Sequence, residues 1–161
     1  VTAVVELKAR FDEEQNINWA EEMERNGVNV VYGFAGLKIH AKLCFVVRRE
    51  KGKLERYTHI GSGNYNAASA KIYTDLGLFT ANKDINDDVQ DLFNVMTGYG
   101  VVNHYRKLLV SPHTLRPGIT KLIRREIERT RSTATAISSS SATSWLTMKW
   151  SRFFMKPAAP V

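Results

Sequence analysis

Residues 36–50 read GLKIHAKLCFVVRRE, and residues 57–66 read YTHIGSGNYN. The first stretch is largely apolar, with His40 and Lys42 two residues apart, and the second contains a glycine-rich turn. Because residues i and i+2 of a strand point to the same face, we expect His40, Lys42 and Arg48 to share one face of a strand. A neutral imidazole beside fixed cations, with the backbone N–H groups of a glycine turn nearby, is suited to nucleophilic chemistry on phosphorus.

The flanking sequence predicts alternating strands and helices. Apolar runs bounded by turn residues predict strands over residues 1–7, 28–32, 38–49, 54–60 and 75–79. Capping residues and helical spacing predict helices over residues 12–25, 66–72, 84–96 and 115–131. The opening strand–helix–strand order favours parallel pairing, which predicts an α/β fold. The segment Glu50-Lys51-Gly52-Lys53 predicts a hairpin turn, which would return the chain so that His40 and Asn64 meet.

The composition is that of a globular chain with a modest basic excess. Its 161 residues include 23 Lys and Arg against 16 Asp and Glu, a formal net charge of +7. This charge permits a polyanionic partner but does not identify one. No apolar run approaches the ~20 residues that cross a bilayer, so we expect no integral membrane span.

Cysteine usage bears on the compartment. The single cysteine, Cys44, excludes an internal disulfide and fits a reducing cytoplasm. We expect its side chain to fill a small buried or half-buried space rather than to act as a nucleophile. We therefore expect a cytoplasmic protein, with the surface of the inner membrane as the alternative location.

The two quoted stretches resemble half of a phospholipase D-type active site, in which His-x-Lys is followed by Gly-Ser-x-Asn. The pattern departs from that type at Val47, where an aspartate is expected, and in the insertion over residues 48–56. Both departures are features of one branch, the polyphosphate kinases. The stretches VELKARFDEEQNINWA and KIYTDLGLFTA are also similar to that family, in order and spacing. The resemblance covers residues 1–131 and corresponds to a middle portion of the family's chain.

This resemblance implies a fold, a reaction and partners. The fold would be an incomplete phospholipase D-like half-domain, with a mixed sheet flanked by helices. The reaction would be reversible transfer of the terminal phosphate of ATP to polyphosphate through a phosphohistidine, with Mg²⁺ as cofactor. The partners would be ATP or ADP and polyphosphate rather than nucleic acid, and the full-length protein would be a homo-oligomer.

The resemblance also assigns roles at the centre of the site. His40 would accept the phosphate, and Lys42 would neutralise phosphate oxygens. His59 would be a second histidine near the site, as a phosphate carrier, an acid or a hydrogen-bonding group. Gly61, Gly63 and Asn64 would cradle phosphate.

Two further residues are implied at the edge of the site. Tyr73 would contact ATP. Arg10 falls where the family has an arginine in its magnesium–phosphate site. We expect Arg10 to clamp phosphate beside the metal, because a guanidinium has no lone pair to donate. Glu6 and Asp75 are the carboxylates nearest to these motifs that could hold magnesium, and this choice rests only on the chemistry of their side chains.

The sequence changes character after residue 131. We expect a partial catalytic domain over residues 1–131 and a tail over residues 132–161 that does not belong to the family. The tail would be an out-of-frame product, with a flexible linker and a natural but poorly patterned tail as alternatives.

Two rival functions remain open from the sequence. One is a phosphodiesterase or nuclease half-site of the phospholipase D superfamily, and the other is a non-enzymatic truncated product. Such folds place two histidine-bearing halves across one cleft, whereas this chain carries a single His-x-Lys motif. We therefore expect the 161-residue chain alone to make little or no polyphosphate.

Overall fold

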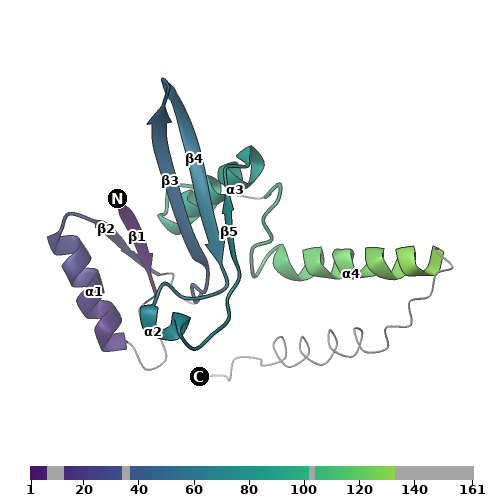
Figure 1. Ribbon diagram of the computed structural model, residues 1–161, viewed down its shortest axis with the longest axis horizontal. Helices are drawn as coiled ribbons and strands as arrows, with labels where there is room; N and C mark the ends of the chain where they lie inside the picture. Colours follow the sequence, from purple (N-terminus) through teal and green to yellow (C-terminus); the bar gives the residue numbers. More distant parts are fainter. Residues whose placement is uncertain (7–12, 34–36, 102–103, 133–161) are drawn as a thin grey trace. The chain divides into compact units, whose positions relative to one another are not determined.

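The computed structural model describes residues 1–6, 13–33, 37–101 and 104–132. The chain divides into two compact units, Val1–Leu109 and Val110–Val161, and each is described by itself. The elements, shown in Figure 1, are β1 (Thr2–Val5), α1 (Glu13–Arg25), β2 (Asn29–Tyr32), β3 (Lys42–Glu50), β4 (Lys53–Gly61), α2 (Ala67–Ala70), β5 (Gly77–Thr80), α3 (Lys83–Met96) and α4 (Leu115–Ser132).

The first unit opens with a parallel strand pair connected through a helix. Strand β1 pairs with β2 from Thr2 opposite Asn29 to Val5 opposite Tyr32, which confirms the predicted parallel arrangement. Helix α1 has acidic residues in its first turn and a basic residue in its last, as the helix dipole favours. The apolar residues that recur at helical spacing in α1 are covered only in part, since Ala20 is buried but Ile17 remains 45% exposed.

The site lies on a separate antiparallel sheet of order β3-β4-β5. The predicted hairpin is confirmed, since Lys51 and Gly52 form its two-residue turn with φ of +48° and +79°. Such turns match the right-handed twist of the strands that they connect. The hairpin returns the chain to its starting level, so that Lys42 at the start of β3 lies opposite Gly61 at the end of β4. The predicted mixed sheet thus consists of two sheets, one parallel and one antiparallel.

Helix α3 covers one face of this antiparallel sheet (Figure 1). Val89 is fully buried, and the ring of Phe45 on β3 stacks on Phe93 with centroids 6.1 Å apart. The buried hydroxyl of Thr58 donates to Oδ1 of Asn86 at 2.6 Å. Successive side chains of a strand alternate between its two faces, and Phe45 and Thr58 face α3. The side chains of Lys42, Cys44 and His59 therefore lie on the face away from α3.

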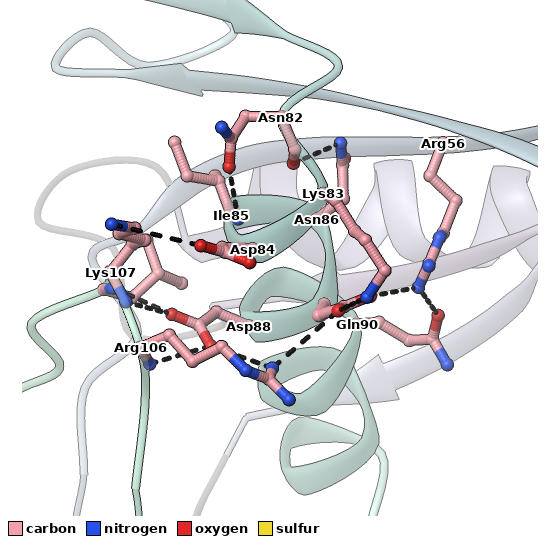
Figure 2. Close-up of polar contacts among 12 residues, drawn as sticks. Arg56, Asn82, Lys83, Asp84, Ile85, Asn86, Asp88, Gln90, Arg106 and Lys107 are labelled. Atoms are coloured by element: carbon pink, nitrogen blue, oxygen red, sulfur yellow. Dashed lines mark hydrogen bonds and ion pairs between the residues drawn. The ribbon is translucent and has the colours of Figure 1, made fainter.

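A buried carboxylate connects α3 to the segment after it. Asp88 is 1% exposed and accepts hydrogen bonds from the backbone N–H groups of Arg106, Lys107 and Leu108 at 3.0, 2.6 and 2.9 Å (Figure 2). This one side chain satisfies three successive backbone donors, so the segment is held without strand pairing. No local pattern around Asp88 predicts this task, because the three backbone donors come from a later segment of the chain.

Three expectations about this sheet are corrected. Strand β3 begins at Lys42, not at residue 38, because β4 ends opposite Lys42 and the Ile39 N–H bonds instead to Oε2 of Glu6 at 2.7 Å. His40 therefore precedes the strand and does not share the regular alternation of its side chains. Cys44 is exposed rather than buried or half-buried, because its side chain lies on the face away from α3.

The second unit is described through α4, which matches the predicted helix over residues 115–131 to within one residue. The carbonyl of Val110 accepts from the N–H groups of Thr114 and Leu115 at 2.8 and 3.1 Å, which sets the start of the helix. Pro117 falls in its first turn, where a missing N–H costs little. Residues 133–161, which carry the expectation of a non-family tail, lie outside the described residues.

Candidate functional site

His40 and Lys42 are in direct contact. The Lys42 ammonium donates to the carbonyl oxygen of His40 at 2.6 Å and lies 3.1 Å from its ring Nδ1. Lys42 is only 9% exposed, while the His40 side chain is exposed. The two side chains are thus brought together as the sequence predicts, but through the irregular segment before β3 and not through strand alternation.

The surroundings favour a neutral imidazole. The pKa of His40 is lowered from 6.5 first by partial desolvation of its ring, part of which still meets solvent, and then by the positive charges of Lys42 and Lys38. Burial also lowers the pKa of Lys42, while the nearby carboxylate of Asp75 acts in the opposite direction. His40 is therefore neutral near neutral pH, which is the form that can attack phosphorus.

The contact between these two residues defines which ring nitrogen carries the proton. A lysine ammonium can only donate hydrogen bonds, so Nδ1 of His40 must accept from it. The neutral ring then carries its proton on Nε2. In this arrangement the nitrogen lone pair of His40 is occupied by Lys42.

The glycine-rich turn is fixed by Asp75. The Ser62 hydroxyl donates to Oδ1 of Asp75 at 2.9 Å and accepts from the Leu76 N–H at 3.0 Å. A Cβ on Gly63 would overlap the Asp75 carboxylate, so the second glycine of the turn is required for space. Asp75 thus provides a negative charge near Lys42, on a chain whose motif has Val47 in place of the usual aspartate.

His59 lies near the end of β4, two residues before the first glycine of the same turn. Its Nδ1 is 2.7 Å from the hydroxyl of Tyr65, and its ring lies 4.4 Å from that of Phe79 at an angle of 33°. A Cβ on Gly77 would come within 2.8 Å of Nε2. A Cβ on Gly61 would come within 3.2 Å of Cε1, so both glycines leave room for the imidazole.

Within the described residues, the other predicted site residues make no hydrogen bond to this cluster. Asn64 has no hydrogen bond to His40 in the part of the chain that the structure describes, although its own carbonyl accepts from the Asn66 N–H at 2.7 Å. Tyr73 is 69% exposed and follows α2. Arg10 lies outside the described residues.

The carboxylates proposed for magnesium have separate tasks. Glu6 accepts from the Ile39 N–H, whereas Asp75 accepts from the Ser62 hydroxyl. The described residues contain no group of three His, Cys, Asp or Glu side chains that could hold a metal ion. A protein-only magnesium cage is thus not formed by these residues. Mg²⁺ bound with phosphate often keeps several waters and needs only one or two carboxylates.

Sequence reasoning missed two supporting residues. Tyr65 lies within a quoted motif but was given no role, because its contact with His59 depends on the path of the turn. Asp75 was recognised only as a carboxylate and not as the partner of Ser62. The sequence signal that could have found it is Gly63 itself, since a glycine can mark a place where another group approaches the backbone closely, and here that group is the Asp75 carboxylate.

Comparison with known proteins identifies a matching family model and close sequence relatives of this chain. A family model described as "Polyphosphate kinase C-terminal domain 1" matches residues 1–102. The polyphosphate kinase of Parasynechococcus marenigrum is 55% identical over 131 residues, which cover 81% of this chain and 18% of that protein. The enzyme of the same name from Prosthecochloris aestuarii is 58% identical over 128 residues, covering 80% of this chain and 18% of that protein.

A solved structure agrees with the sequence relatives. The crystal structure of polyphosphate kinase from Porphyromonas gingivalis superposes with a TM-score of 0.68 at 40% identity, over 82% of this chain and 22% of that one. The predicted α/β phospholipase D-like class, in partial form, is therefore confirmed. The chain belongs to the polyphosphate kinase family, and it spans about 18% of the length of the relatives that it matches.

Proposed function

We propose that this chain carries the phosphate-accepting part of a polyphosphate kinase, which transfers the terminal phosphate of ATP reversibly to polyphosphate. The observation that carries the proposal is the contact of the Lys42 ammonium with Nδ1 of His40 at 3.1 Å, at the level of the glycine-rich turn. It combines a neutral nucleophile with a cation that can meet phosphate oxygens.

The transfer occurs in two balanced steps. A lone pair on the His40 ring attacks the terminal phosphorus of ATP, the bond from phosphorus to the bridging oxygen breaks, and ADP leaves with the electron pair. A terminal oxygen of polyphosphate then attacks the phosphohistidine, the P–N bond breaks, and His40 is restored. Because charge spreads over the phosphoryl oxygens in the transition state, fixed cations contribute more than further covalent chemistry.

Lys42 has a second task in this scheme. While its ammonium donates to Nδ1, the lone pair of the neutral His40 ring is not available. Phosphate oxygens at the turn are stronger acceptors for an ammonium than a neutral imidazole is, because they are ionised. Arrival of phosphate therefore draws Lys42 away from the ring and exposes the nucleophile.

The remaining assignments follow the family resemblance. Backbone N–H groups over residues 61–63 and the side chain of Asn64 hold phosphate. Tyr73 contacts the nucleotide, and Arg10 clamps phosphate beside Mg²⁺. When bound, the metal neutralises phosphate charge.

The wider setting is part of the same proposal. The catalytic domain covers residues 1–131, and the full-length enzyme is a homo-oligomer of the cytoplasm or the inner-membrane surface. None of the described helices is both long and apolar enough to cross a bilayer.

The test places residues 1–131 in the corresponding part of a full-length polyphosphate kinase. We expect ATP-dependent polyphosphate synthesis that is lost in the His40→Ala variant and retained in the His113→Ala variant, since His113 is exposed and lies in the other unit. Hydrolysis of plasmid DNA or phosphatidylcholine without polyphosphate synthesis would favour the phosphodiesterase alternative and contradict the proposal.

A further inference from the structure

The imidazole of His59 is oriented by two contacts and lies beside two glycines. Tyr65 binds its Nδ1 at 2.7 Å, and Phe79 on β5 packs against its ring at 4.4 Å. Gly61 and Gly77 lie beneath it, and they face each other across β4 and β5. The hydrogen bond to Tyr65 and the packing on Phe79 orient the ring, and the absence of side chains at Gly61 and Gly77 gives it the space that it occupies.

The two glycines are needed for space and not for backbone conformation. Neither Gly61 nor Gly77 has a positive φ, so each backbone conformation is accessible to other residues. A Cβ at Gly77 would nevertheless come 2.8 Å from Nε2 of His59, closer than carbon and nitrogen atoms tolerate. The ring therefore occupies the space that side chains at Gly61 and Gly77 would otherwise fill.

The hydrogen bond between Tyr65 and His59 has a preferred polarity. A phenol hydroxyl is a good donor and a poor acceptor, whereas the unprotonated nitrogen of imidazole is a good acceptor. Burial first, and the neighbouring Cys44 second, raise the pKa of the Tyr65 hydroxyl, which keeps its proton in place at neutral pH. The bond therefore runs from Tyr65 to Nδ1, and the neutral ring carries its own proton on Nε2.

We propose that Tyr65 is a positioning residue that fixes His59 as a hydrogen-bond donor to phosphate through Nε2–H, an inference that rests on the proposed function. In this tautomer the only lone pair of the ring is bound by Tyr65. His59 then donates to a phosphate oxygen held at the glycine-rich turn and is not a second carrier of phosphate. The three roles that the sequence left open for His59 are thereby reduced to one.

The first test reads the tautomer directly, without any phosphoryl transfer. Long-range ¹H–¹⁵N correlation spectra of the 161-residue chain, recorded at mildly alkaline pH, should show a protonated Nε2 and an unprotonated Nδ1 for His59. The Tyr65→Phe variant should show a mixture of tautomers. The matched control is Tyr57→Phe, since that hydroxyl bonds to Glu50 at 3.1 Å near the far end of the hairpin and should leave His59 unchanged. A protonated Nδ1 in the parent chain, or no change on Tyr65→Phe, would overturn the inference.

A second variant tests the role of space beside the ring. Gly77→Ala should displace the imidazole and move the ring proton shifts of His59, which arise in part from its contact with Phe79. Gly100→Ala is the control, because its Cβ would make only an ordinary 3.7 Å contact with Asn94. Unchanged His59 shifts in Gly77→Ala would contradict the position of the ring on which the inference depends.

The last test separates this inference from the proposed function. In a full-length polyphosphate kinase that carries residues 1–131, Tyr65→Phe should lower kcat by about three- to tenfold, the loss expected for one net hydrogen bond, with KM for ATP little changed. Acid-labile label from ATP should be absent from His59, also in the His40→Ala variant. Label on His59 would refute its role as a donor. Failure of the parent enzyme to make polyphosphate would refute the proposed function but leave the spectroscopic result standing.

Discussion

Lys42 is a nearly buried cation whose hydrogen bonds both go to His40. Taking a charge out of water costs free energy, which is why burial lowers its pKa. The folded-state pKa is below the unfolded value, so this residue's contribution to stability is greatest at high pH and is lost as the pH falls through its pKa. At neutral pH the fold therefore tolerates Lys42 at some cost.

This cost predicts a separation of stability from activity. Lys42→Met keeps the length of the side chain and removes the buried charge, so the free energy of unfolding should stay within about 1 kcal/mol of the parent value or rise. Phosphoryl transfer in the full-length enzyme should fall at least tenfold, because a contact of the kind worth about 1.5–3 kcal/mol is lost. Denaturant unfolding measures the predicted effect on stability, and initial rates measure the predicted effect on phosphoryl transfer. A variant that loses cooperative unfolding but keeps its specific activity would show that Lys42 is a structural residue.

His40 gives a pH prediction of its own. Burial, Lys42 and Lys38 lower its pKa, so its titration midpoint should fall below the ordinary 6.5. A depressed histidine pKa contributes stability that is present above the unfolded pKa and lost as the pH falls through the folded one. Removing Lys42 should raise the midpoint, which an NMR titration of the His40 ring protons measures. Lys53→Met, a change at an exposed residue at the start of β4, should leave the midpoint in place. A midpoint unchanged by Lys42→Met would contradict the assigned contact.

At the scale of elements, the glycine-rich turn depends on space for Asp75. Gly63→Ala should push the Asp75 carboxylate away and break its bond with Ser62. Affinity for tripolyphosphate, measured by calorimetry on the 161-residue chain, should therefore weaken in Gly63→Ala but not in Gly100→Ala. Equal affinities in the two variants would show that the arrangement of the turn does not matter for phosphate.

Asp88 predicts a stability effect without an effect on the site. Burial raises its pKa, but hydrogen bonds from three backbone N–H groups outweigh burial and lower it overall. The stability that it contributes is present above the unfolded pKa and is lost in acid as the pH falls through the folded pKa. Asp88→Asn should cost about 2–3 kcal/mol at neutral pH and should flatten this acid dependence. Asp84→Asn, on a half-exposed residue of the same helix, should cost less than about 1 kcal/mol. Thermal unfolding across pH distinguishes the two.

Local chemistry decided which elements could be predicted. The hairpin turn was predictable because Gly52 suits the positive φ that a two-residue turn requires, although Lys51 also adopts a positive φ. The start of β3 was not, because it depends on where β4 ends and on a hydrogen bond from Ile39 to the distant Glu6. The exposure of Cys44 was missed for a similar reason, since sequence alternation does not say which face of a sheet a helix covers.

At the scale of the whole molecule, the sequence motifs were sufficient to predict the family and the partial α/β fold. The central pair, His40 and Lys42, was predictable because the two residues are neighbours in sequence. Tyr65 and Asp75 were not assigned their tasks, because each acts through a contact that the path of a turn creates. The boundary at residue 131 and the nature of the tail stay predictions, since residues 133–161 lie outside the described part of the chain.

The most direct test of the central claim is the location of the transferred phosphate. A full-length polyphosphate kinase that carries residues 1–131 is incubated with Mg²⁺ and ATP labelled in its terminal phosphate, quenched in alkali and digested, and the labelled peptide is sequenced by mass spectrometry. We predict acid-labile label on His40, lost in His40→Ala and chased into polyphosphate on addition of unlabelled ATP. Label on another residue, or synthesis of polyphosphate by the His40→Ala enzyme, would contradict the assignment of His40 as the phosphate acceptor.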